Sequence, residues 1–135
     1  MAYNKPLPVM QGWTKEFYEF CRKRELRLQR CKHCRTWRHI ARPMCSVCQS
    51  WDWEWAKASG RGTLFTWCTV YEPPTPLFED EAPYAGIVVE LEEGPRMVSW
   101  IGGIDPAKLR AGMPLEVWFD DVTPEITLPK FKPAS

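Results

Sequence analysis

Two Cys-x-x-Cys pairs in the first half of the chain, a helix-spaced aromatic stretch before them and five strand-like segments after them predict a mainly β protein. The predicted architecture is an N-terminal helix and a rubredoxin-like zinc ribbon, followed by a five-stranded OB-fold barrel. We place an arm and an amphipathic helix in residues 1–25, the zinc ribbon in residues 26–58 and the barrel in residues 59–135. With 135 residues, the chain has room for a small metal module beside a larger one.

The N-terminal segment combines an arm with a helix. Pro6, Pro8 and the lack of any periodicity predict an extended arm over residues 1–11. From Gly12 the pattern becomes helical, and Thr14 is the predicted N-cap. The helix carries an aromatic stripe, formed by Trp13, Phe17 and Phe20. This stripe could cover the chain's own core or dock on another subunit, and we favour docking because a small ribbon has little core to cover.

Four cysteines form the strongest functional motif. They are arranged as two Cys-x-x-Cys pairs with ten residues between them: Cys31, Cys34, Cys45 and Cys48. Four thiolates are the ligand set that tetrahedral zinc prefers, and iron, as in rubredoxin, is the alternative metal. Because four protein ligands close the site, a zinc ion there would stabilise the fold and would not activate water.

The segments around the cysteines read as strands. Residues 25–30 alternate as a half-buried strand that leads to Cys31, and residues 36–40 are predicted to form a β-hairpin joining the two knuckles. His33 and His39 are expected at the surface, because four cysteines already satisfy zinc. Residues 51–55 alternate between indoles and acids, which places Trp51, Trp53 and Trp55 on one face of a strand. We expect the ribbon and the next module to cover this face, with another protein as the alternative.

The second half of the chain reads as a barrel. Gly60 and Gly62 permit a bend before the first strand. Strands are predicted at residues 63–71, 84–91, 96–101, 115–119 and 126–131, with an acidic loop after the first. A short helix is predicted at residues 105–110, with Asp105 as its N-cap. A five-stranded order with a helix between the third and fourth strands indicates an OB-fold.

Charge is unevenly distributed along the chain. Residues 1–48 contain 11 Lys or Arg and 3 acids, whereas residues 49–135 contain 7 and 14. The basic half favours a polyanionic or acidic partner. No apolar run approaches the roughly 20 residues of a membrane span, and the first residues lack the apolar core of a signal peptide, so we expect a cytoplasmic protein. Cys21 and Cys68 are expected to be reduced and buried.

Several motifs together resemble one known family. They are Leu-x-Leu-Gln-Arg-Cys-x-x-Cys, Arg-Pro-x-Cys-x-x-Cys, Ser-Gly-x-Gly-Thr, Gly-Met-Pro-Leu-Glu-Val and Thr-Leu-Pro-Lys-Phe-Lys-Pro. The chain resembles the zinc-ribbon and OB-fold family associated with acyl-CoA metabolism, whose members are small non-catalytic subunits of thiolase-like enzymes, including acyltransferases and lipid-transfer-type aldolases of lipid and steroid degradation. The resemblance maps the four zinc ligands onto Cys31, Cys34, Cys45 and Cys48. It implies a heterotetramer with a thiolase-like large subunit that holds most of the CoA ester.

Two groups of residues are expected to serve such an assembly. The partner-binding residues are expected to be aromatic: Trp13, Phe17, Phe20, Trp51 and Trp53. Basic residues are expected near the CoA: Arg61, Lys130 and Lys132. The sequence contains no convincing catalytic constellation, so we do not expect the chain to be an enzyme by itself.

A different function remains open at this stage. OB-folds and zinc ribbons also bind single-stranded nucleic acid, through aromatic platforms in a basic groove. The predicted barrel is acidic, with Glu79, Asp80 and Glu81 in one loop, and would repel phosphates. We therefore expect nucleic-acid binding to be the less favoured function.

Overall fold

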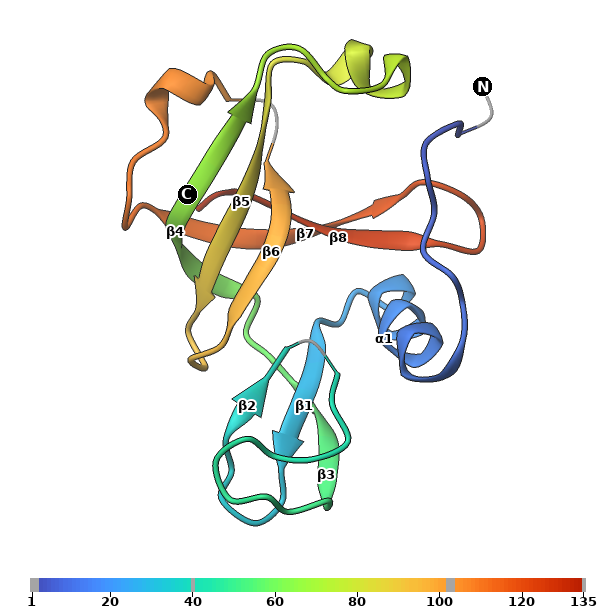
Figure 1. Ribbon diagram of the computed structural model, residues 1–135, viewed down its shortest axis with the longest axis vertical. Helices are drawn as coiled ribbons and strands as arrows, with labels where there is room; N and C mark the ends of the chain where they lie inside the picture. The colour runs from blue at the N-terminus through green and yellow to red at the C-terminus, as the bar shows by residue number, and fades with distance from the viewer. Residues whose placement is uncertain (1–2, 40, 102–103, 135) are drawn as a thin grey trace.

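The computed structural model describes residues 3–39, 41–101 and 104–134. It contains a three-stranded sheet, a five-stranded closed barrel and one α-helix. Figure 1 shows the small sheet below the barrel, with the helix beside the junction between them. The predicted fold class, a helix and a ribbon followed by a five-stranded barrel, is confirmed.

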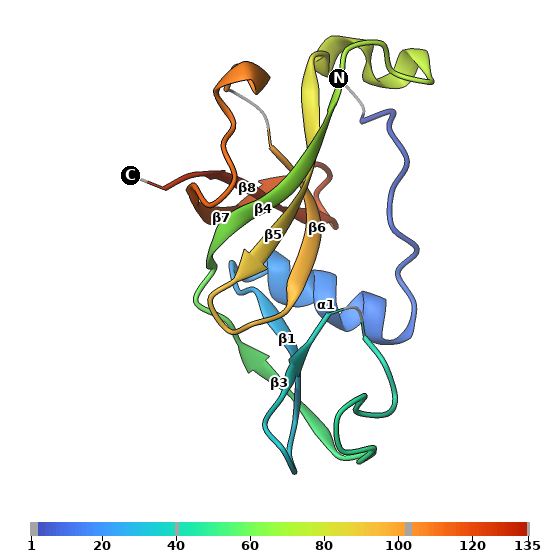
Figure 2. The same ribbon diagram turned by 60° about the vertical axis from the view of Figure 1, so that its left-hand side comes forward.

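Helix α1 (Gly12–Arg22) lies between the small sheet and the barrel, as both views show (Figures 1 and 2). It begins at Gly12, where the helical pattern starts in the sequence, but Gln11 is the extended residue before it, so the assignment of Thr14 as N-cap is wrong. The buried residues of α1 are Phe17 and Cys21, one turn apart on the same face. Arg24 then adopts a left-handed conformation with φ of 64°, and the chain turns away into the sheet.

The small sheet has the order β2-β1-β3 and is antiparallel throughout. Its strands are β1 (Arg27–Cys31), β2 (Trp37–Arg38) and β3 (Trp53–Lys57). Strand β2 pairs back onto β1, so the first cysteine knuckle is itself the turn of the hairpin. The predicted hairpin over residues 36–40 is therefore wrong in its partner, and Ile40 lies outside the described residues.

The barrel closes in the order β4-β5-β6-β8-β7, which is the OB-fold arrangement. Its strands are β4 (Arg61–Val70), β5 (Tyr84–Leu91), β6 (Arg96–Ile101), β7 (Pro114–Asp121) and β8 (Thr127–Pro133). Short 3-10 helices occupy the acidic loop (Pro76–Glu81) and the connection between β6 and β7 (Pro106–Lys108). Asp105 caps the second of these, with its carboxylate accepting from the Ala107 amide at 3.0 Å, as the sequence predicts.

The two glycines at the start of the first barrel strand, Gly60 before it and Gly62 within it, are needed for close approach. Gly60 has φ of +83°, and a Cβ there would lie 2.6 Å from Cγ1 of Val117. A Cβ on Gly62 would lie 2.6 Å from the Glu90 carbonyl oxygen. Side chains at these positions would collide with β7 and β5, so the glycines allow the chain to enter the barrel tightly against both neighbours.

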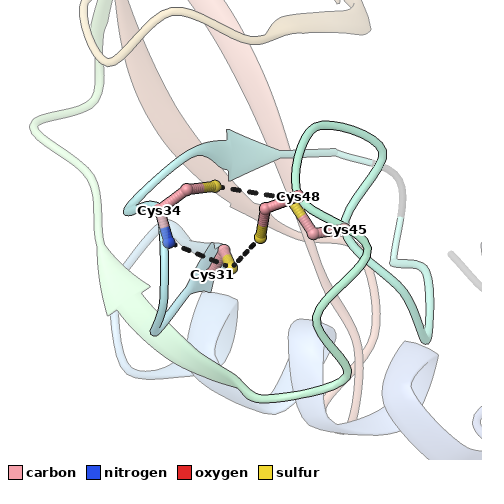
Figure 3. Close-up of side chains that lie close together, drawn as sticks. All are labelled: Cys31, Cys34, Cys45 and Cys48. Carbon is pink, nitrogen blue, oxygen red and sulfur yellow. Dashed lines mark hydrogen bonds between the residues drawn. The ribbon is translucent and has the colours of Figure 1, made fainter.

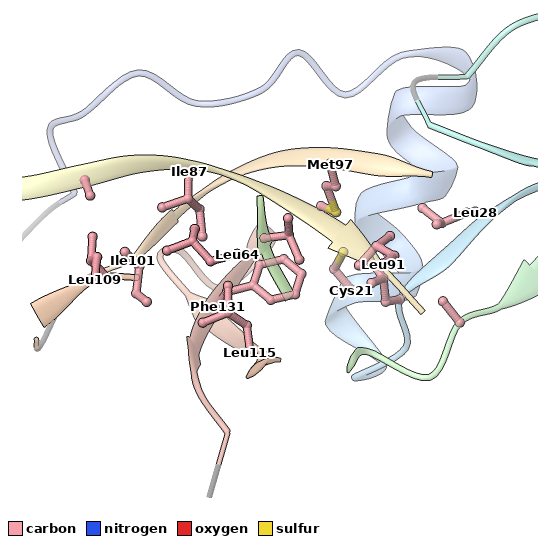
Figure 4. Close-up of a cluster of buried hydrophobic side chains, with 14 of the residues drawn as sticks. Cys21, Leu28, Leu64, Ile87, Leu91, Met97, Ile101, Leu109, Leu115 and Phe131 are labelled. Atoms are coloured by element: carbon pink, nitrogen blue, oxygen red, sulfur yellow. The ribbon is translucent and has the colours of Figure 1, made fainter. Parts of the chain in front are cut away.

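One continuous core joins the barrel to the helix and the small sheet. Phe131, Leu64, Ile87, Ile101 and Leu115 fill the barrel and are almost completely buried. The same cluster extends through Leu91 and Met97 to Cys21 and Leu28, which come from α1 and β1 (Figure 4). Burial of this apolar surface is the main favourable contribution to the stability of the barrel.

The N-terminal arm is attached to its own chain. The Lys5 ammonium lies 3.0 Å from a Glu81 carboxylate oxygen and 3.2 Å from an Asp80 carboxylate oxygen in the acidic loop. Hydrogen bonding to Glu81 raises the pKa of Lys5. The arm therefore extends from the acidic loop of the barrel to α1, and does not need another protein to hold it.

Over residues 3–39, 41–101 and 104–134, we find no helix with the length and apolar character required to cross a membrane.

Candidate metal centre

The four predicted metal ligands converge at the end of the small sheet. The thiol sulfurs of Cys31, Cys34, Cys45 and Cys48 all lie within 4.8 Å of one another. Cys31 and Cys48 approach to 3.5 Å, as do Cys34 and Cys45, so each pair joins the two knuckles across the site (Figure 3). A tetrahedral zinc with Zn–S bonds of about 2.3 Å separates its sulfurs by about 3.8 Å, so this donor set fits one such ion.

The two knuckles have the same backbone design. The Cys31 amide donates to the Thr36 carbonyl and the Cys45 amide to the Ser50 carbonyl, both at 2.9 Å. The residue that follows each cysteine pair has a left-handed conformation: φ is 66° at Arg35 and 65° at Gln49. This conformation is uncommon for residues other than glycine, and it turns both cysteines of a pair toward one point.

Backbone amides point at two of the four sulfurs, those of Cys31 and Cys45, and favour their thiolate form. Val47 donates to the Cys45 sulfur at 3.4 Å, and Cys34 donates to the Cys31 sulfur at 3.5 Å. Amide hydrogen bonds from Cys48 and Val47 lower the pKa of Cys45 to about 6. The pKa of Cys31 is lowered as well, chiefly by the Cys34 amide. Thiolate is the form that binds metal, so these amides prepare the site.

Neither histidine joins the four cysteines. His33 is exposed, as expected, whereas His39 is half-buried and packs against the Phe17 ring at 5.5 Å between centroids. Burial lowers the pKa of His39. Among the described residues, the metal-ligand group consists of the four cysteines alone, so no histidine lies close enough to replace a cysteine as a ligand.

A buried amide, Gln29, holds the connection between the knuckles in place. The Gln29 side-chain oxygen accepts from the Arg38 guanidinium and from the Arg42 amide, both at 2.7 Å. The Arg38 guanidinium also donates to the Arg42 carbonyl at 2.8 Å. This network ties the loop before Cys45 to β1 and was not foreseen. The sequence offers one indication of it, because Gln29 is an uncharged polar residue in a strand that is otherwise apolar and basic.

The aromatic face of β3 is covered by the chain's own helix. Trp53 and Trp55 pack edge to face at 5.2 Å, Trp13 contacts Trp53 at 5.5 Å, and Phe20 contacts Trp55 at 5.7 Å. The expectation that the ribbon and the barrel cover this face is therefore incorrect. Trp51 lies before β3 and does not take part, so the predicted row of three indoles contains two.

The predicted partner-binding residues are thus distributed over different environments. Phe17 is buried in the core, which argues against its predicted role in docking. Trp13, Phe20 and Trp53 pack on one another or on neighbouring aromatics within the chain. Trp51 is 68% exposed and keeps the environment that a docking residue needs.

The three basic residues expected near CoA are also differently placed. Lys130 pairs with Asp120 at 2.7 Å and lies over the Trp100 and Trp118 rings, so its charge is already used within the chain. Arg61 and Lys132 are strand neighbours of Glu116 on either side. Both are exposed, although Arg61 pairs with Glu92 at 2.9 Å and Lys132 with Glu116 at 3.7 Å.

The two remaining cysteines differ from each other. Cys21 is fully buried, and this burial raises its pKa to about 12, which makes it inert as a nucleophile. Cys68 is exposed on β4, so the prediction that it is buried is wrong. Nearly every residue of this segment favours a strand, so the sequence does not indicate which of them face outward from the barrel.

Two domain families match the sequence. A family described as "ChsH2, rubredoxin-like zinc ribbon domain" matches residues 19–54, and one described as "ChsH2, C-terminal OB-fold domain" matches residues 55–120. These matches cover the cysteine site and most of the barrel.

Relatives carry two kinds of names. A "Probable enoyl-CoA hydratase alpha subunit" of Thermomonospora curvata is 38% identical over 130 residues, which are 96% of this chain and 40% of that protein. This chain therefore spans less than half the length of that relative. A "DUF35 domain-containing scaffold protein" of Pyrococcus furiosus is 32% identical over 117 residues, covering 84% of this chain and 79% of that protein.

Solved structures agree with these matches. A chain of the "Ltp2-ChsH2(DUF35) aldolase" is 37% identical and superimposes with a TM-score of 0.83, over 97% of this chain and 100% of that one. A protein of unknown function from the DUF35 family of Sulfolobus solfataricus, 10% identical with a TM-score of 0.59, shares the fold.

Proposed function

The chain belongs to the DUF35 family, with the zinc-ribbon and OB-fold domains of ChsH2, and from this we propose that it is a non-catalytic accessory subunit. It assembles with a thiolase-like large subunit that acts on a CoA ester. The large subunit is a thiolase, an acyltransferase or a retro-aldolase of the lipid-transfer type. The accessory subunit stabilises it in a hetero-oligomer, for which we expect a heterotetramer.

The observation that carries this proposal is the whole-chain likeness to a component of an aldolase named for two proteins. The likeness extends over 97% of this chain, at 37% identity. The scaffold and alpha-subunit names of other relatives point in the same direction, since both describe parts of an assembly.

The chemistry of the chain supports a role without catalysis. A metal held by four thiolates has no open position for water or substrate. The buried Cys21 is protonated at neutral pH, because its pKa is raised to about 12. The reacting groups of the assembly then belong to the large subunit.

We propose zinc as the resident metal. Four cysteines at mutual distances below 4.8 Å and a closed site are typical of structural zinc, and iron is the less favoured choice. Cys31, Cys34, Cys45 and Cys48 would hold the ion, which supplies folding free energy and no chemical step.

Any contact with CoA is assigned to Arg61 and Lys132. Both side chains are exposed and flank Glu116, whereas Lys130 is closed off by Asp120 and two indoles. Because carboxylates already accompany both cations, we expect the large subunit to hold most of the CoA ester.

Single-stranded nucleic acid is the weaker alternative. The acidic loop of the barrel holds Glu79, Asp80 and Glu81, and the hairpin between β5 and β6 carries Glu90, Glu92 and Glu93. Phosphates would meet negative charge along these edges. We expect binding of single-stranded DNA no tighter than about 10⁻⁴ M at physiological salt.

Co-expression with a thiolase-like large subunit, taken from the genes next to this one where they encode such a protein, tests the proposal. We expect the two proteins to elute together from size exclusion and the large subunit to gain activity or solubility. Separate elution of two folded proteins would contradict the accessory role, and micromolar, salt-dependent binding of single-stranded DNA would favour the alternative.

A further inference from the structure

The end of the ribbon farthest from the barrel exposes three large apolar side chains within eight residues. Val47 is 67% exposed, Trp51 68% and Met44 42%. We call these three residues the ribbon tip. Such residues are normally buried, and exposed clusters of this kind mark interaction sites.

The backbone of the second knuckle brings the tip together. The hydrogen bond from the Cys45 amide to the Ser50 carbonyl, at 2.9 Å, closes the loop, so Met44 and Trp51 flank the closed ends. Val47 lies between Cys45 and Cys48 at the turn. A metal held by Cys45 and Cys48, on either side of Val47, would keep this loop in one conformation and so lower the entropy cost of docking.

The ribbon that carries the tip has a positive net charge. The Lys32 amide donates to the Asp52 carbonyl at 3.0 Å, which places the exposed Lys32 next to Trp51, where the exposed Asp52 also lies. Arg35 and Arg42 are exposed on the same module, and of these three cations Arg35 has a carboxylate nearby, Glu54 at 3.7 Å. Residues 26–58 contain seven Lys or Arg and two acids, so the ribbon stays positive even after the two negative charges of a zinc tetrathiolate.

This chemistry selects the class of partner. A complementary surface has an apolar depression for Val47 and Trp51, with carboxylates at its rim for Lys32 and Arg35. Single-stranded nucleic acid is a poorer fit, since Met44 and Val47 are aliphatic and offer no face for base stacking. The aromatic face of β3 is already covered by α1, so it does not compete for this role.

We infer that the ribbon tip is the docking surface for the large subunit, on an acid-rimmed apolar depression of that protein. The inference rests on the proposed function and adds to it the location and the chemistry of the contact. The aromatic helix, which the sequence favoured for docking, instead holds the ribbon against the barrel.

A matched pair of valines tests the inference in the co-expressed complex. Val47→Asp places a charge in the tip, and Val98→Asp does the same at an equally open valine on the barrel, 75% exposed. We expect Val47→Asp to weaken binding of the large subunit at least about tenfold, and Val98→Asp to leave it within about twofold. The Val47 amide that donates to Cys45 is unchanged by the substitution, so metal content and melting temperature should match the wild type.

Other outcomes are decisive too. Should Val47→Asp lose metal, Trp51→Ser replaces it as the test, because Trp51 lies outside the knuckle. Wild-type binding retained in Val47→Asp or Trp51→Ser would overturn the inference and leave the accessory function standing, whereas a wild-type chain that binds no large subunit would overturn the function itself. A Lys32→Glu variant that loses binding to a single-stranded oligonucleotide, yet keeps the large subunit, would assign the tip to nucleic acid.

Discussion

The ribbon and the barrel are folded by different means. The barrel buries Phe131, Leu64, Ile87 and their neighbours in a closed core, whereas the far end of the ribbon has four cysteine sulfurs at its centre. An apolar core must bury the apolar side chains that form it, so they are not available at the surface. A metal centre has no such requirement, so Met44, Val47 and Trp51 can face outward while the loop that carries them stays in one conformation.

Helix α1 connects the two regions. Its buried residues Phe17 and Cys21 enter the core shared with the barrel, and its aromatic residues Trp13 and Phe20 cover the indoles of β3. The comparison therefore predicts that loss of the metal disturbs the ribbon first, while loss of core volume destabilises the whole chain. Four changes test or refine this division.

Removal of one metal ligand should have the largest effect. Cys34→Ser should lose the metal and the ordered ribbon, since structural zinc contributes on the order of 10–16 kcal/mol of apparent binding free energy in small zinc domains. Metal analysis of the purified protein together with amide exchange measures both. Cys68→Ser, which removes an exposed thiol outside the site, is the matched control and should keep one metal ion per chain.

A cavity in the barrel should be the next largest change. Phe131→Ala removes a completely buried ring and should lower the free energy of unfolding by about 3–5 kcal/mol. Urea titration of wild type and variant gives the difference. If the variant kept its stability, the barrel would not depend on this core in the way described here.

Removal of one aromatic side chain from α1 should lower the stability of the chain by less. Trp13→Ala removes the edge-to-face contact with Trp53 at 5.5 Å, and aromatic pairs contribute about 0.5–1.5 kcal/mol beyond their buried area. We expect a lower melting temperature with unchanged affinity for the large subunit. A variant with an unchanged melting temperature but a lower affinity for the large subunit would show instead that α1 takes part in docking.

The ion pair between the end of α1 and the barrel should have the smallest effect. Arg24 Nη1 lies 2.8 Å from Asp121 Oδ1, and this contact, with the Thr127 hydroxyl, lowers the pKa of Asp121. Because the pKa is lowered in the folded state, the stabilisation is fully present above the ordinary value of about 3.9 and is lost as the pH falls through the lower folded value.

The matching variant is Asp121→Asn. Its melting temperature should lie slightly below that of the wild type by the same margin at pH 7 and at pH 5, and the margin should shrink below about pH 4. High salt should shrink it as well, since both side chains are about half exposed. A margin independent of both pH and salt would show that the pair does not contribute.

Features with local causes could be predicted from the sequence. The strands over residues 84–91 and 96–101 were predicted with their observed ends, because turn residues bound each one. The metal ligands follow from spacing, and Asp105 follows from the chemistry of helix capping.

Features that depend on distant contacts could not be predicted. Nothing near Trp53 in the sequence says that α1 covers it, and the pairing of β2 with β1 depends on how the first knuckle turns. The role of Gln29 requires Arg38 and Arg42 to fold back over it. The exposure of Val47 becomes informative only when four cysteines, and not an apolar core, are seen at the centre of its loop.

We expect a metal to hold the ribbon and an apolar core to hold the barrel. Amide exchange of the wild-type protein before and after treatment with a chelator tests this central expectation most directly. We predict that protection is lost over residues 31–57 of the ribbon, while the amides of β5 and β6 in the barrel keep theirs. Loss of protection throughout the chain would show that the metal holds the barrel as well, and unchanged protection in the ribbon would show that the four cysteines do not hold its fold.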